Sequence, residues 1–258
     1  MNEIVAIAGV VIKEMIRRKD FYVLFFITAL ITLVMGSVTL FHDPHIVRYL
    51  KEICLLLIWI SALVIAVTTA ARQIPAEREN RTIFPLLAKP VTRTQLIFGK
   101  FLGCWLAVGI TLIVFYLFFG VVAMSKEHAW PLANYFQAIW LHWVMLGIII
   151  AMTLLGSLIF AAVSSNATIC LVAAIFILLL GRHLDKVAIQ SGELFRLVLL
   201  TIYFTIPHLE FFDLRDLMIH DWNPLSWVVC GEATIYAAAY ILLFLGISCL
   251  LFRRKALN

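Results

Sequence analysis

The chain has 258 residues, of which 64% are hydrophobic and 14% are charged, and its mean hydropathy is +1.03. A soluble domain has about half of its residues apolar and about a quarter charged. The composition therefore excludes a soluble globular protein and predicts an all-α polytopic membrane protein. In such a chain the distribution of Lys and Arg among the loops is informative, because it indicates which loops lie inside the cell. The net charge of +5 therefore does not indicate binding to nucleic acid, and we expect no nucleic-acid partner.

Residues 1–20 are expected to form an amphipathic helix on the inner membrane surface. Apolar residues recur there at helical spacing, namely Ile4, Ile7, Ala8, Val11, Ile12, Met15 and Ile16. Lys13, Arg17 and Arg18 lie off this stripe, as in interfacial helices. The alternative is a cytoplasmic extension of the first span. The apolar run that follows exceeds the about 7–15 residues of a signal-peptide core, so we expect an uncleaved span.

Six segments are apolar enough to cross the roughly 30 Å bilayer core as helices of about 20 residues. They are residues 21–41, 53–71, 101–124, 138–163, 167–180 and 227–252. The stretch 128–181 holds 54 residues without Asp, Glu, Lys or Arg, about 80 Å as one helix. We therefore expect it to be divided at the polar residues Ser164, Ser165 and Asn166.

The charges predict which side of the membrane each loop faces. Loops that share a side with the two termini carry 13 Lys and Arg residues, whereas the opposite loops carry 7. The positive-inside rule then places both termini in the cytoplasm. We expect a multi-pass protein of the cytoplasmic (inner) membrane, surrounded by membrane lipid, with residues 1–258 forming one transmembrane domain.

Residues 72–100 join the second and third spans with far more chain than a short connection needs. Pro75 suits a first helical turn, and Glu77 and Glu79 would lie near the positive end of that helix's dipole. A second helix is expected after Pro90, with Thr92 as its N-cap. From these residues alone, a docking element and a solvated loop with a basic rim remain equally open.

This stretch resembles the first cytoplasmic loop of ABC-2 type permeases, the membrane subunits of one class of ATP-binding-cassette (ABC) transporter. The family pattern has an acidic-basic-acidic triplet, Gly or Arg before Thr, an apolar pair, Pro-Val-x-Arg and Gly-Lys. The matching residues are Glu77-Arg78-Glu79, Arg81-Thr82, Leu86-Leu87, Pro90-Val91-Thr92-Arg93 and Gly99-Lys100. Arg81 stands where the family more commonly has Gly.

The resemblance implies a cytoplasmic coupling helix, between spans 1–2 and spans 3–4, that docks on a separate ATPase (nucleotide-binding) subunit. It implies charged contacts there by Glu77, Arg78, Glu79 and Arg81, packing by Thr82 and Ile83, and bracing of the loop by Pro90, Arg93 and Lys100. It also implies a second permease copy, in a homodimer or heterodimer, and substrate export.

ATP and Mg are expected on the partner subunit, with no cofactor on this chain. A P-loop requires G-x-x-x-x-G-K-[ST]. The only Gly-Lys pair here is Gly99-Lys100, which Phe101 follows, with no Gly five positions earlier.

Residues 181–226, before the sixth span, are expected to form a re-entrant outer helical insertion. Its apolar run 197–207 is too short to cross a bilayer. The insertion is rich in His and acidic residues, including His208 and Glu210, but no two His stand at i and i+4. We therefore expect a polar cap, or a gate as in the resembled family, rather than a metal site.

His142 and Glu232 are ionisable residues within predicted spans, where such residues are candidates for a substrate path. His142 lies between Trp140 and Trp143, which also fits an aromatic belt, and Glu232 also fits the outer interface. With His208 and Glu210, they are the candidate gate or path residues. The alternatives to a permease are an integral membrane enzyme and a membrane scaffold. HExxH and GxSxG motifs are absent and acids are nearly absent from the spans, so we expect no catalytic residues.

Overall fold

The computed structural model describes residues 2–37, 45–79, 92–127, 132–190 and 192–254. Within these ranges all regular secondary structure is helical. The elements are α1 (Asn2–Arg17), α2 (Lys19–Ser37), α3 (His45–Ala71), α4 (Pro75–Glu79), α6 (Arg93–Glu127), α7 (Leu132–Ile159), α8 (Val163–Gln190), α9 (Glu193–Thr205), the 3-10 helix η1 (Leu209–Phe212), α10 (Arg215–Ile219) and α11 (Trp227–Arg254).

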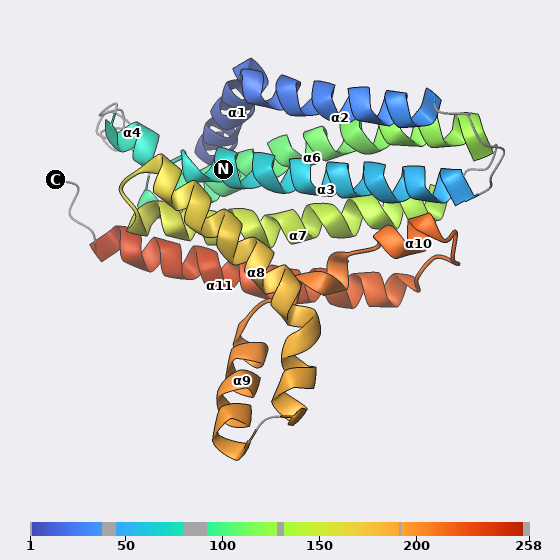
Figure 1. Ribbon diagram of the computed structural model, residues 1–258. Helices are drawn as coiled ribbons and strands as arrows, with labels where there is room; N and C mark the ends of the chain where they lie inside the picture. The colour runs from blue at the N-terminus through green and yellow to red at the C-terminus, as the bar shows by residue number, and fades with distance from the viewer. Residues whose placement is uncertain (1, 38–44, 80–91, 128–131, 191, 255–258) are drawn as a thin grey trace.

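Helices α2, α3, α6, α7 and α11 run side by side as an elongated bundle (Figure 1). One end of the bundle, here called the α4 end, holds α1, α4 and the C-terminus; the opposite end, the α10 end, holds α10. Helix α8 starts at the α4 end and crosses the bundle obliquely. Its far half packs with α9 as a hairpin that projects from the side of the bundle.

Five helical segments of the described residues are long and apolar enough to cross a membrane. They are Arg48–Glu79, Arg93–Ala123, Leu132–Ile159, Val163–Gly181 and Trp227–Arg254, and they coincide with predicted spans two to six. The predicted first span falls on α2, whose described apolar part is the shorter segment Phe21–Val34. Residues 38–41 of that prediction lie outside the described residues.

The predicted outer insertion is helical, and part of it forms a bent pair. Segments Phe195–Thr205 and Leu209–Ile219 meet at 40°. Such a pair is either one broken span, which would count as a sixth, or a re-entrant loop. The fifth predicted span continues as α8 to Gln190, ten residues beyond its predicted end at residue 180.

The predicted break at Ser164, Ser165 and Asn166 was wrong by a few residues. Helix α7 ends at Ile159 and α8 begins at Val163, so the polar cluster forms the first turn of α8. Asn166 is fully buried, and its Nδ2 donates to the carbonyl oxygens of Ala71 and Thr153, each at 3.3 Å. The amide thus satisfies a carbonyl at the C-terminal end of α3, where helices leave such groups unpaired.

Helix α1 is separate from α2 and steeply inclined to it, with the break at Arg18 (Figure 1). The alternative of a continuous extension of the first span is therefore wrong. Part of the predicted apolar stripe is buried against α6 rather than left for lipid, namely Ile7, Ala8, Val11 and Met15. Gly103 of α6 allows the close approach, because a Cβ there would lie 2.7 Å from Val11 Cβ and 2.9 Å from Ala8 Cα.

We predict that Gly103→Ala destabilises the protein by about 1–3 kcal/mol, because the added methyl group must displace the α1 backbone. The measurement is the unfolding midpoint in mild detergent. Gly246→Ala in α11 is the matched control, since a Cβ there meets nothing within 4 Å. Equal midpoints for the two variants would contradict the close packing of α1 on α6.

Candidate functional site

Helix α4 is closely attached to the end of α3. Pro75 is buried at the start of α4, where its missing N–H leaves no helical hydrogen bond unmade. The connecting residue Ile74 is buried, and its carbonyl oxygen accepts a hydrogen bond from Arg78 N at 3.1 Å. The side chain of Gln73 is also buried, and its Nε2 donates to the carbonyl of Thr69 at 3.1 Å.

Lys100 ties this corner to α6. Its side chain is 5% exposed, and its Nζ forms an ion pair with Glu77 Oε1 and donates to Gln73 Oε1 at 3.1 Å. A buried ammonium group is tolerated only when it is paired and hydrogen-bonded. The ion pair therefore holds α4 against α6, and Gln73 links the same ammonium to the end of α3.

The first turn of α6 is joined to both terminal helices. Thr92 Oγ1 accepts from Gln95 N at 3.2 Å and Gln95 Oε1 accepts from Thr92 N at 2.8 Å. This capping box confirms Thr92 as the N-cap. Gln95 Nε2 donates to Glu3 Oε2 of α1 at 3.0 Å. Arg93 Nη1 donates to the carbonyl of Phe252 at 2.6 Å, near the negative end of the α11 dipole.

The structure thus brings together some of the predicted loop residues. Glu77 and Lys100 are paired, and Arg93 contacts α11. Arg78 is half-buried and Glu79 is exposed on α4. The remaining predicted contacts, Arg81, Thr82, Ile83 and Pro90, lie outside the described residues.

At the α10 end, the predicted residues His208 and Glu210 lie together. His208 Nδ1 is 3.1 Å from Glu210 Oε1, and His208 N–H donates to Tyr236 Oη at 2.9 Å. Beside them Arg215 donates to both carboxylate oxygens of Asp213, each at 2.8 Å. The sequence analysis gave Asp213 and Arg215 no individual role, because only the fold brings them next to α3.

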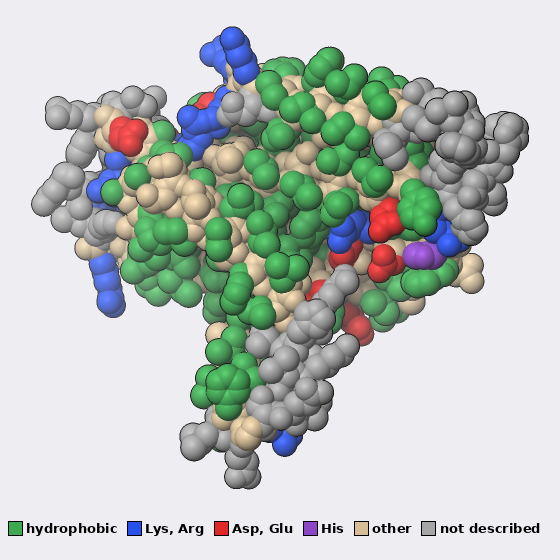
Figure 2. Space-filling model, viewed as in Figure 1, with side chains coloured by type: hydrophobic (Ala, Val, Ile, Leu, Met, Phe, Trp, Pro, Cys, Tyr) green, Lys and Arg blue, Asp and Glu red, His purple; other side chains and the backbone are tan. Residues whose placement is uncertain are grey.

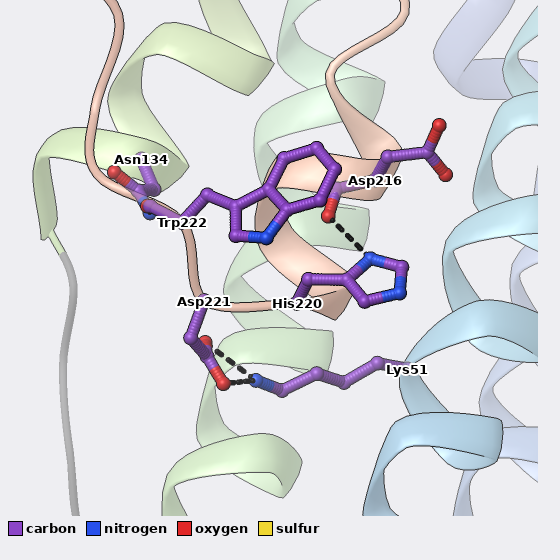
Figure 3. Close-up of polar contacts among 6 residues, drawn as sticks. All are labelled: Lys51, Asn134, Asp216, His220, Asp221 and Trp222. Atoms are coloured by element: carbon purple, nitrogen blue, oxygen red, sulfur yellow. Dashed lines mark hydrogen bonds and ion pairs between the residues drawn. The ribbon is translucent and has the colours of Figure 1, made fainter.

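The turn after α10 is bound to two spans (Figure 3). Lys51 of α3 is buried, and its Nζ donates to both carboxylate oxygens of Asp221 at 2.8 and 3.0 Å. Asp221 has a φ of 51°, a left-handed conformation that Asp tolerates better than most residues. Asn134 Nδ2 of α7 donates to the carbonyl of Trp222 at 2.8 Å. The polar turn is therefore anchored to α3 and α7.

His142 lies inside the bundle rather than in a surface aromatic belt. It is 2% exposed, its Nδ1 is 3.4 Å from Tyr116 Oη, and its ring stacks on Trp59 at 6.0 Å. Trp59 in turn lies under the Arg215 guanidinium, 5.2 Å from its ring centroid. These contacts connect the α10 end to the interior, and the sequence analysis missed Trp59. Glu232, by contrast, is exposed on α11.

In the part of the chain that the structure describes, no group of three or more His, Cys, Asp or Glu side chains is placed to hold a metal ion. The arrangement is that of a polytopic helical membrane protein in which α4 is ion-paired with α6 at one end and the turn after α10 is anchored to α3 and α7 at the other.

The comparison with protein families agrees with this class. A family model described as ABC-2 family transporter protein matches residues 5–257. Since the match covers nearly the whole chain, the chain belongs to the ABC-2 family of transporter membrane proteins, which confirms the resemblance seen in residues 72–100. A search of curated proteins found no match.

We predict that Lys100→Met lowers the free energy of unfolding by about 3 kcal/mol. Removing one partner of a buried ion pair costs about 3–5 kcal/mol, because the other charge is left buried and unpaired. The low end is expected because the Glu77 side chain is 17% exposed. The double variant Lys100→Met/Glu77→Gln should recover part of the loss. The measurement is a double-mutant cycle of unfolding midpoints in detergent.

Lys13→Met, an exposed lysine of α1, is the matched control. If Lys100→Met were as stable as Lys13→Met, the ion pair would not hold α4 in place.

Proposed function

We propose that the chain is the permease subunit of an ABC transporter, powered by a separate ATPase subunit that binds ATP and Mg, and that α4 is its coupling helix. The observation that carries the proposal is the buried ion pair between Glu77 and Lys100. A docking helix transmits movement only if it is held by the spans. Here α4 is hydrogen-bonded to the turn that follows α3, through Ala76 N to Arg72 O and Arg78 N to Ile74 O, and it is ion-paired with α6.

The residues available to a partner are those of α4 that do not face the bundle. Glu79 is exposed and Arg78 is half-buried, so both offer charge-assisted hydrogen bonds to another chain. In the proposal Arg81, Thr82 and Ile83 extend this contact, with Pro90 and Arg93 bracing the loop. Glu77 has a further role, because its carboxylate anchors α4 through Lys100.

The proposed orientation places the α4 end in the cytoplasm. The α4 end carries both termini and the described parts of the basic loop, residues 72–79 and 92–100, in agreement with the positive-inside rule. Helix α1 would then lie at the inner surface of the cytoplasmic membrane, and the α10 end would form the outer cap or gate. Export is the direction that the family resemblance favours.

A second permease copy is part of the proposal. In the apolar segments of α8 and α11, only 17% and 22% are buried inside the protein, whereas 72% of the apolar segment of α7 is buried. Such faces require lipid or another apolar helix. A homodimer or a heterodimer with a related chain would cover part of them, and membrane lipid the rest.

We predict that the double variant Arg78→Glu/Glu79→Lys loses its ATPase partner without losing its own fold, since neither side chain takes part in the Glu77 ion pair. The measurement is a pull-down of the tagged protein from mild detergent, followed by an ATPase assay. Glu14→Lys, a charge reversal at an exposed position of α1, is the matched control and should retain the partner.

If no ATPase co-purifies with the wild type under any mild condition, the permease proposal fails, and the enzyme and scaffold alternatives return. If the ATPase co-purifies equally with both variants, the transporter proposal stands but α4 is not its docking helix.

A further inference from the structure

A cavity of about 530 Å³ lies between the middle parts of α3 and α8, beside η1 and the start of α10. This volume is within the range of small-molecule sites, about 300–1,000 Å³. Its walls are aliphatic, formed by Leu56, Ile60, Leu63 and Val64 of α3 and by Leu171, Ile175, Leu178 and Leu179 of α8. Its polar lining consists of Trp59, Glu210, Asp213 and Arg215. Figure 2 shows charged side chains near the α10 end beside a mostly hydrophobic surface.

Two buried polar atoms of this lining have no hydrogen-bond partner among the described residues. They are Nε1 of Trp59, a donor, and Oε2 of Glu210, an acceptor. An unpaired buried polar group costs free energy, so such groups are normally satisfied by protein, water or a ligand. Arg215 donates through Nε and Nη2 to Asp213, and Glu210 Oε2 has no hydrogen bond from Arg215 or from any other described residue.

The surroundings of Glu210 favour a cation. The Arg215–Asp213 pair is neutral, and His208 contacts only the other carboxylate oxygen, Oε1, of Glu210. The ionisable residues of the lining are two acids, Glu210 and Asp213, and one base, Arg215, so the lining holds one acidic side chain in excess. The Glu210 carboxylate also packs directly on the α8 backbone, since a Cβ added at Gly181 would collide with it. Its position is therefore set by α8 as well as by η1.

The apolar part has the length and the opening that an alkyl chain requires. From Leu56 to Val64 the wall extends over eight residue steps of α3, about 12 Å of helix. Four wall residues are exposed on the outside of the bundle: Leu56, Ile60, Ile175 and Leu179. Because they belong to candidate spans, the cavity opens sideways into the membrane.

We propose that this cavity binds a single-chain amphiphile with a small amino-alcohol head. The ammonium group donates to Glu210 Oε2, the hydroxyl oxygen accepts from Trp59 Nε1, and the alkyl chain lies between α3 and α8. Such a ligand gives a hydrogen-bond partner to each of the two unpaired atoms, and its positive charge balances the excess acidic side chain. That the ligand is also the transported substrate rests on the proposed transport function, whereas its binding does not.

The test is equilibrium binding of radiolabelled N-dodecylethanolamine to the full-length protein in phosphatidylcholine nanodiscs, with dodecanoic acid as the probe of opposite charge. Glu210→Gln should weaken binding of the amine at least about tenfold, because a charge-assisted hydrogen bond is lost. Trp59→Phe should weaken it less. Gly181→Ala should also weaken it, because the added methyl displaces the carboxylate while its charge remains.

Glu52→Gln, the same substitution at an exposed position of α3, is the matched control and should bind as the wild type does. Equal affinity of the wild type and Glu210→Gln, or equal affinity for dodecanoic acid, would overturn the proposal. So would failure of the amine to bind while Ile175→Cys forms a disulfide between two copies, because the cavity would then be a subunit interface. If the amine binds but no ATPase co-purifies with the wild type in the pull-down, this site stands and only the proposed transport function fails.

Discussion

The ammonium group of Lys100 is the constraint on which the α4 end depends. Helix α6 carries it into the end of a largely apolar bundle, where a charge is stable only with a close counter-ion. Glu77 supplies that counter-ion from α4, and Gln73 adds an acceptor from the turn before it. The same pairing that makes Lys100 tolerable therefore fixes the position of α4, and a contact made by a partner with α4 would act on α6 directly.

The α10 end follows the same rule with different partners. Lys51 is buried on α3 and is paired with Asp221 in the turn after α10, while Arg215 is paired with Asp213 and lies over Trp59. These contacts attach the polar cap to the spans. They leave Glu210 Oε2 and Trp59 Nε1 buried without a hydrogen-bond partner in residues that line a cavity, which is why that cavity, rather than the ion pairs, is the candidate for a ligand.

Much of the fold could be predicted from the sequence, because the bilayer requires long apolar helices and charges mark their ends. Long apolar helices lie where spans two to six were predicted, and the Thr92 N-cap is confirmed by its capping box with Gln95. The helix break was misplaced because Asn166 is a polar residue with partners on α3 and α7, which no local pattern reveals. Likewise the pairing of Glu77 with Lys100 joins residues 23 positions apart, and the role of Trp59 depends on contacts with α7 and α10.

The most direct test of this account is whether α4 and α6 move as one body. Spin labels at Ala76→Cys on α4, a half-buried position outside the proposed ATPase contact, and at Leu106→Cys on α6 would report the distance between the two helices by pulsed electron paramagnetic resonance, after the five native cysteines are replaced. The measurement compares the complex with its ATPase partner before and after ATP is trapped. The account predicts an unchanged distance in the wild type and a shifted or broadened one in Lys100→Met. A distance in the wild type that changes when ATP is trapped would contradict it.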